Sequence, residues 1–192
     1  MRSLSSLIAL LAVAALGAGP AGATDFKFGL NAGGALPMVD LKDFNDSTYG
    51  VIGGFVQIHL GGGHVIRPRV EGIFAKETSG NYNTSKVFKK NVSGLNVTAD
   101  YAYYVEGRPE GFYISGGVGM MGYTAKIAWD AYENKESSSN AGLTVGVGYD
   151  LPIGLGFDVR YGMSKFKVNH PKVSYDGDPK AAAVYATVSW KF

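Results

Sequence analysis

The chain has 192 residues, with 18 lysines and arginines against 16 aspartates and glutamates, and a formal net charge of +2 at pH 7. A charge balance this close to neutral gives no reason to expect a nucleic-acid partner. Because the sequence contains no cysteine, it can form neither a disulfide framework nor a thiolate metal site. Its length suits one β-barrel or β-sandwich domain.

The N-terminal segment has the pattern of a secretory signal peptide. A basic start precedes an apolar run at residues 7–16, and the small residues 21–23 follow. A retained membrane helix, the competing interpretation, would need about 20 apolar residues. We therefore expect export through the general secretory route and cleavage after Ala23, which makes residues 1–23 the signal peptide and residues 24–192 the barrel domain.

Beyond the signal peptide, the chain repeatedly alternates apolar and polar residues, with turn-forming residues between the alternating segments. A period of two places successive side chains on opposite faces of a strand. We count eight such segments, at about residues 25–34, 49–60, 66–77, 95–106, 112–120, 143–151, 155–164 and 181–192. Their apolar faces are nearly free of charge, which a β-sandwich would not explain. The pattern predicts an all-β fold, an eight-stranded antiparallel up-and-down transmembrane β-barrel with a polar interior.

The connections between these segments alternate in length. Short turns are expected near residues 61–64, 107–110 and 152–154, and longer polar loops near 35–48, 78–92, 126–140 and 169–180. In outer-membrane barrels the short turns are periplasmic and the long loops extracellular, so both termini should lie at the short-turn end. Pro68 cannot donate a backbone hydrogen bond, and we expect a bulge or a late strand start there.

The last segment ends on an apolar face that includes Val188, Trp190 and Phe192. With the alternation that precedes it, this ending resembles the outer-membrane protein β-barrel domain family, the small barrels related to the OmpA membrane domain and OmpX. The resemblance extends over residues 24–192 and implies an integral protein of the bacterial outer membrane. It also implies that these three residues form the signal read by the barrel-assembly machinery, and that periplasmic chaperones are partners during biogenesis.

Five charged residues occupy positions that alternate with the apolar face of their strands, which we call inward parity. They also lie at a similar distance from the short-turn end, which we call their height, and they are Arg69, Glu71, Asp100, Asp158 and Arg160. An eight-stranded barrel is just wide enough for its own side chains. We therefore expect these residues to form an ion-pair network that fills the lumen. The alternative interpretation is a gate or selectivity constriction in a narrow channel.

Four lysines share the lipid-facing parity but lie at the long-loop ends of their strands, namely Lys76, Lys126, Lys165 and Lys167. Lysines at this height would meet the phosphates of lipopolysaccharide. Alternatively, the strands extend past the membrane and the lysines are solvated.

Motifs that suggest chemistry are weak in this sequence. Residues 117–122 match the dinucleotide-binding glycine pattern, but they lie inside a predicted strand instead of between a strand and a helix. The histidines, His59, His64 and His170, show no metal-ligand spacing. We therefore predict no catalytic, cofactor or metal site.

The sequence thus predicts a non-enzymatic outer-membrane barrel. Its role would be structural in the envelope and interactive at the cell surface through four extracellular loops, with outer-membrane lipid and lipopolysaccharide as partners. A narrow porin-like channel for ions or small solutes is the alternative. A lipid-modifying enzyme, in which His59 would activate a nearby serine, is the weakest hypothesis. No extracellular ligand is indicated.

Overall fold

The computed structural model describes residues 25–81, 87–129, 132–165 and 180–192. The predicted signal peptide lies outside these residues. The described part of the chain contains nine strands and one short helix. They are β1 (Phe26–Met38), α2 (Asp40–Phe44), β2 (Tyr49–Gly61), β3 (His64–Ala75), β4 (Thr78–Asn81), β5 (Val87–Tyr104), β6 (Gly111–Trp129), β7 (Tyr132–Asp150), β8 (Leu155–Lys165) and β9 (Lys180–Lys191). No helix among the described residues is both long enough and apolar enough to cross a bilayer.

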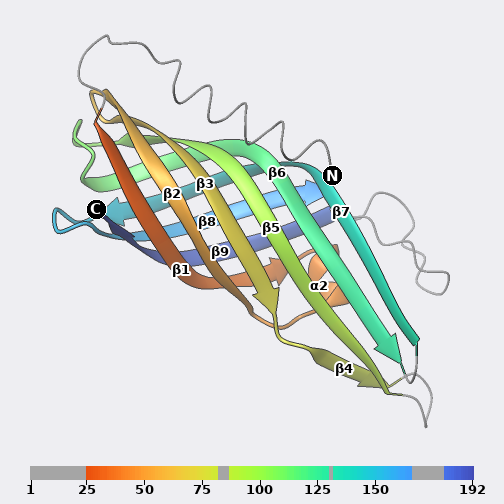
Figure 1. Cartoon of the computed structure of the whole chain (residues 1–192). Helices are drawn as coiled ribbons and strands as arrows, with labels where there is room; N and C mark the ends of the chain where they lie inside the picture. The colour runs from red at the N-terminus through yellow and green to blue at the C-terminus, as the bar shows by residue number, and fades with distance from the viewer. Residues whose placement is uncertain (1–24, 82–86, 130–131, 166–179) are drawn as a thin grey trace.

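The strands form one closed antiparallel barrel (Figure 1). Their order is β3-β2-β1-β9-β8-β7-β6-β5-β4, and a further pairing of β3 with β5 closes the wall. The short β4 pairs with the far end of β5 and so continues the line of β3. The barrel therefore has eight strands around its wall, and the predicted fold is confirmed.

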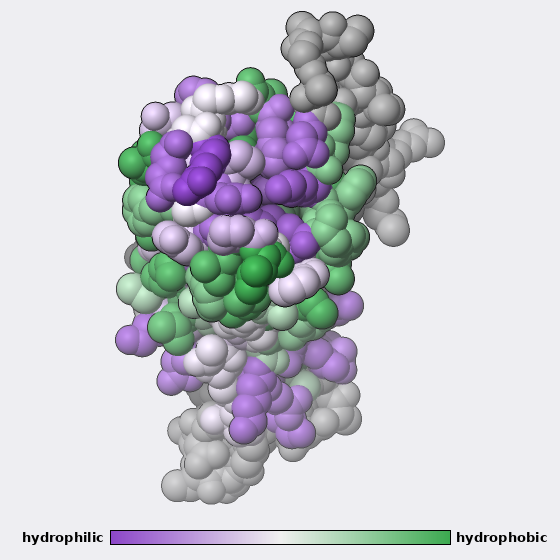
Figure 2. Space-filling model, turned by 90° about the vertical axis from the view of Figure 1, so that its left-hand side faces the viewer, coloured by the Kyte–Doolittle hydropathy of each residue, from purple (hydrophilic) through white to green (hydrophobic). Residues whose placement is uncertain are grey.

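The outer face of the barrel is apolar, as the alternation predicted. Side chains such as Leu30, Val118 and Val145 are at least 60% exposed there. Viewed from the short-turn end, hydrophilic residues gather on the end of the molecule and hydrophobic residues lie on the sides around it (Figure 2). Two residues of outward parity differ from the prediction, because Ile58 and Val97 are only 7% and 3% exposed.

The described residues of two expected long loops, 78–92 and 126–140, lie in strands instead. Strands β5, β6 and β7 have 18, 19 and 19 residues, whereas the other barrel strands have 11 to 13. At about 3.3 Å per residue, six extra residues carry them some 20 Å past the rest of the barrel, at the lower right of Figure 1. Residues 78–92 and 126–140 were expected to be loops because they are rich in polar residues, and the few apolar ones that face inward, such as Val92 and Ile127, do not extend into a long alternation.

Pro68 does not cause the expected bulge or late strand start. Strand β3 begins at His64, four residues earlier, and its pairing with β5 runs through Pro68 without a shift. On the other side, the pairing with β2 is interrupted between Phe55↔Arg69 and Ile58↔Ile66, yet the register is the same before and after the gap. The missing N–H is therefore accommodated by a local gap in one ladder.

Candidate functional site

The structure brings the five predicted interior residues into one buried cluster. Nη2 of Arg69 lies 3.2 Å from a carboxylate oxygen of Asp100, and Nη1 lies 3.4 Å from Glu71 and 3.5 Å from Asp158. Arg160 donates to Glu71 at 2.6 Å through Nη2 and to Asp158 through Nε. All five side chains are at most 4% exposed. Each charge is thus paired inside the barrel, as burial of charge requires.

Sequence reasoning missed a second charged group nearer the short turns. The Asp150 carboxylate forms ion pairs with Nζ of Lys191 at 2.6 Å and with Nη2 of Arg67 at 3.3 Å. It also accepts a hydrogen bond from the Tyr104 hydroxyl. Nη1 of Arg67 also donates to the Tyr113 hydroxyl at 2.9 Å. The sequence shows that these residues have inward parity. They were not predicted as part of the network because they lie nearer the short turns than the first five residues.

The Tyr113 hydroxyl joins the two groups, because it donates to Asp158 at 3.0 Å. We call the joined set the ionic layer. It contains equal numbers of cations and anions, which are Arg67, Arg69, Arg160, Lys191, Glu71, Asp100, Asp150 and Asp158.

Two inward glycines make room for the long side chains of the ionic layer. A Cβ on Gly117 would lie 2.2 Å from Oδ1 of Asp100, and a Cβ on Gly146 would lie 2.4 Å from Cγ of Arg160. Several buried polar atoms of the barrel interior make no hydrogen bond within the described chain, among them Nε of Arg69 and Oγ1 of Thr98. Such atoms are usually satisfied by ordered water. The ionic layer is therefore a polar environment that does not by itself exclude water.

Toward the long loops the interior changes character and becomes apolar, which the sequence analysis did not predict. We call this cluster the apolar layer. It comprises Ala35, Leu41, Tyr49, Val51, Ile73, Val92, Met121, Tyr123, Ala125, Ile127, Ala181, Ala183 and Tyr185.

Every strand of the barrel wall contributes to closing this part of the lumen. Strands β7 and β8 contribute glycines, against which larger side chains pack. A Cβ on Gly142 would lie 2.7 Å from Sδ of Met121, and a Cβ on Gly162 would lie 3.0 Å from the Tyr185 ring. The two layers meet at Tyr185, whose ring lies 5.3 Å from the Arg160 guanidinium and whose hydroxyl accepts a hydrogen bond from Asn96 at 3.1 Å.

Helix α2 covers the long-loop end of the apolar layer. Its Leu41 side chain is completely buried in that layer. The Tyr49 hydroxyl donates to the Asn45 carbonyl at 3.0 Å, and Asp40 accepts a hydrogen bond from the Lys180 N–H at 2.7 Å. Val39, which precedes the helix, has φ of 53°, a conformation that is strained for a β-branched residue.

The described lysines among the predicted four lie at the long-loop end. Lys126 forms a 2.9 Å ion pair with Glu133, and Lys165 is exposed opposite Lys180 on β9. Lys76 is exposed, and its carbonyl accepts hydrogen bonds from Asn45 and Ser47. Lys167 lies outside the described residues. The three described lysines thus lie on separate segments, Lys76 after β3, Lys126 on β6 and Lys165 at the end of β8.

The residues of the predicted assembly signal lie on the outer face at the short-turn end. Val188, Trp190 and Phe192 are 46%, 53% and 69% exposed. The Phe192 N–H donates to the Phe28 carbonyl at 2.9 Å, so the last residue of the chain is still paired with β1.

Of the remaining chemical candidates, His59 is described, and His170 lies outside the described residues. Nδ1 of His59 lies 3.3 Å from Asp25, and Nε2 lies 3.4 Å from Gln57. Neither partner is a hydroxyl nucleophile. The glycine-rich residues 117–122 lie inside β6, and no group of metal-ligating side chains occurs within the described ranges.

A closed antiparallel barrel with an apolar outer face, polar ends and a paired charged interior is the architecture of an integral membrane β-barrel. The chain belongs to the outer membrane protein beta-barrel domain family, whose model matches residues 8–192. It is therefore an integral protein of the bacterial outer membrane.

Solved structures share this fold. The N-terminal β-barrel domain of Pseudomonas aeruginosa OprF has a TM-score of 0.55 at 11% identity, and the alignment covers 88% of this chain and 99% of that one. Neisserial surface protein A has a TM-score of 0.55 at 17% identity, with 89% and 100% covered. Ail, the attachment invasion locus protein of Yersinia pestis, has a TM-score of 0.51 at 14% identity, with 88% and 97% covered. No curated protein matches the chain in sequence.

Proposed function

We propose that this protein is a closed, non-enzymatic barrel that supports the integrity of the outer membrane and presents its extracellular segments for interactions at the cell surface. The observation that carries this proposal is the apolar layer, to which side chains or glycines of all eight barrel strands contribute. A hydrophobic constriction stops ions because it does not stay wet.

The alternative, a narrow channel, is favoured only by the ionic layer. Its buried polar atoms without protein partners suit a hydrated segment of the lumen. Such a segment would nevertheless end at Met121 and Tyr185, which are 0% and 1% exposed. A conducting path would therefore need the apolar layer to rearrange.

The extended hairpins support a surface role. Strands β4 to β7 project beyond the barrel wall and expose polar side chains, including the ion pair between Lys89 and Glu77 at 2.9 Å. Recognition residues commonly lie on segments that a rigid scaffold positions. The lysines Lys76, Lys126 and Lys165 at the long-loop end, together with Lys167, would contact lipopolysaccharide phosphates.

The proposal also includes a route of export and assembly. Export through the general secretory route would precede delivery by periplasmic chaperones, and the barrel-assembly machinery would read Val188, Trp190 and Phe192. Deleting Phe192 should sharply lower the amount of heat-modifiable barrel in the outer membrane. Undiminished assembly of this truncated chain would contradict the assigned signal.

The surface role is tested with a trimmed hairpin. Ile127 and Asn134 are direct partners on β6 and β7, so an Asn-Gly turn that replaces residues 128–133 would preserve their register and leave Ile127 in the apolar layer. In a strain that lacks the protein, we expect wild type and the trimmed variant to restore resistance to detergent, and only wild type to restore adhesion to a lipopolysaccharide-coated surface. Equal adhesion would contradict the role of the hairpin, and unchanged detergent sensitivity on deletion would contradict the structural role.

A further inference from the structure

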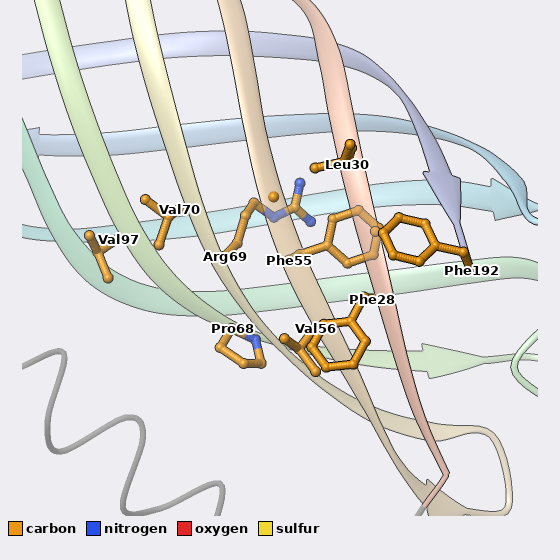
Figure 3. A pocket seen from close by; sticks show the side chains of 11 residues that line it. Phe28, Leu30, Phe55, Val56, Pro68, Arg69, Val70, Val97 and Phe192 are labelled. Atoms are coloured by element: carbon orange, nitrogen blue, oxygen red, sulfur yellow. The ribbon is translucent and has the colours of Figure 1, made fainter.

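The outer face of the barrel carries an apolar hollow of about 500 Å³ over β1, β2, β3 and β5 (Figure 3). The side chains around it come from strands that are far apart in sequence. Those that matter here are Phe28, Leu30, Pro68, Val70, Val97 and the C-terminal Phe192.

The hollow exists because two residues of outward parity, Gly54 and Pro68, do not cover the outer surface of the wall with a large side chain. Gly54 lies directly between Leu30 on β1 and Val70 on β3, and it has no side chain to place there. Pro68 borders the hollow where the β2–β3 ladder is interrupted. The surrounding outer face is otherwise covered by exposed apolar side chains. Phe55 and Arg69, which pair at the edge of this interruption, also line the hollow. The hollow is therefore a depression in the lipid-facing surface that reaches into the gap between β2 and β3.

The hollow lies toward the short-turn end. The first residue of β1 beside it, Phe28, is hydrogen-bonded to Phe192 at 3.2 and 2.9 Å. Since short turns are periplasmic in this class of barrel, the lipids at this height belong to the inner leaflet. The hollow therefore faces phospholipid tails.

A polar aromatic cluster lies on the same strands at the short-turn end. The His64 imidazole is hydrogen-bonded to the Tyr101 hydroxyl, and its ring centroid lies 5.1 Å from that of Tyr103. His64 precedes Pro68 by four residues on β3, which corresponds to about 13 Å along the strand at about 3.3 Å per residue. This height is that of the interface, where Tyr side chains gather in membrane proteins.

We propose that the hollow binds one acyl chain of an inner-leaflet phospholipid, and that the phosphate of this lipid lies beside His64 and Tyr101. The established lipid-facing surface is continuous with the hollow, so the occupant is a lipid. Within a bilayer there is no hydrophobic gain, and the preference for this site comes from the van der Waals contacts that a recessed chain makes on several sides. The proposal is independent of the surface role of the loops.

Gly54→Leu is the direct test, because it fills the hollow. A Cβ at Gly54 has its nearest neighbours at 3.5 and 3.7 Å, so a side chain fits without disturbing the backbone. Gly50→Leu is the matched control, since Gly50 is an exposed glycine on the same strand and face near the long-loop end, where a Cβ would lie 3.8 Å from Phe74. Heat-modifiable migration establishes that each variant is folded.

The proteins are purified in detergent, mixed with a phospholipid and examined by native mass spectrometry. We expect wild type and Gly50→Leu to retain one phospholipid, and Gly54→Leu to retain at least tenfold less. Equal retention by Gly54→Leu, or no retention by wild type, would overturn the site. A stronger retention of purified lipid A than of phospholipid would overturn the assignment to the inner leaflet.

The headgroup contact has its own test. A His64→Ala and Tyr101→Phe double variant should retain phospholipid severalfold less than wild type, while its retention of diacylglycerol, which has no phosphate, should be unchanged. Equal losses for both lipids, or no loss for either, would overturn the assignment of the phosphate to this cluster.

Discussion

The two layers of the barrel interior fill the same lumen by different physics. In the ionic layer, charges of opposite sign are paired at distances such as 2.6 Å between Arg160 and Glu71, and long side chains lie over glycines. In the apolar layer, Met121 and Tyr185 pack against glycines of β7 and β8, and Leu41 of α2 closes the end. The comparison shows that a lumen filled with side chains is not necessarily closed to water. A polar layer can hold water between its side chains, whereas an apolar layer excludes water.

The largest effect is expected in the ionic layer. Glu71 accepts hydrogen bonds from Arg160 and Asn31, both at 2.6 Å. Glu71→Gln leaves the buried arginine short of a counter-charge, which should cost about 3–5 kcal/mol of unfolding free energy. Urea unfolding in lipid vesicles measures the loss. The control Glu77→Gln breaks an exposed pair with Lys89 and should change nothing measurable, so equal effects in the two variants would contradict the account.

In the apolar layer, Met121→Ala should cost roughly 2–5 kcal/mol through the cavity it leaves. Because no charge is involved, the loss should be the same at low and high salt. Met163→Ala is the control, since this methionine is 45% exposed on the outer face and should lose much less. A loss at Met121 that varies strongly with salt would remove the physical distinction between the layers.

The outer face differs from both layers, because it contacts lipid. A charged side chain there has no partner, whereas the charges of the ionic layer are paired. Val145 is 60% exposed to the outside and adjoins Gly146, which packs on Arg160. Val145→Arg should destabilise the inserted barrel by about 2–4 kcal/mol. Equal unfolding midpoints for this variant and wild type in bilayers would show that the assigned facing is wrong.

The smallest effect concerns the end of the apolar layer. Val39 has φ of 53° beside α2, and relief of that strain in Val39→Gly should exceed the entropic cost of glycine, with a net stabilisation of about 1 kcal/mol. Thermal unfolding of the purified barrel measures the gain. A destabilised Val39→Gly variant would mean that the side chain of Val39 contributes more than its backbone strain costs.

The fold could be predicted because a period of two specifies which side of a strand faces lipid. Residues such as Leu143, Val145 and Val147 alternate with small or polar partners, and the strand count and the facing of most residues follow from that alternation. The same parity pointed to Arg69, Glu71 and Arg160 as interior groups. Distances and partners could not be derived from parity.

The apolar layer and the extended hairpins could not be predicted for opposite reasons. Val51 and Ile73 have inward parity in strands whose outward residues are also apolar, so hydropathy does not distinguish the two faces. In the hairpins polar residues predominate, as at Thr124 and Ser137, whose hydroxyl oxygens are 2.9 Å apart, and the stretch 133–140 of β7 contains no apolar residue, so no long alternation is visible. Leu41 lies in a helix of five residues, which is too short to show a helical period.

The measurement that tests the closed interior most directly is single-channel conductance of the refolded mature protein in a planar bilayer, with Arg160→Ala alongside. Because the apolar layer closes the lumen independently of the ionic layer, we expect no steady current from inserted protein in either case. A steady current through wild type that Arg160→Ala alters would contradict the account and would identify a small channel controlled by its interior charges.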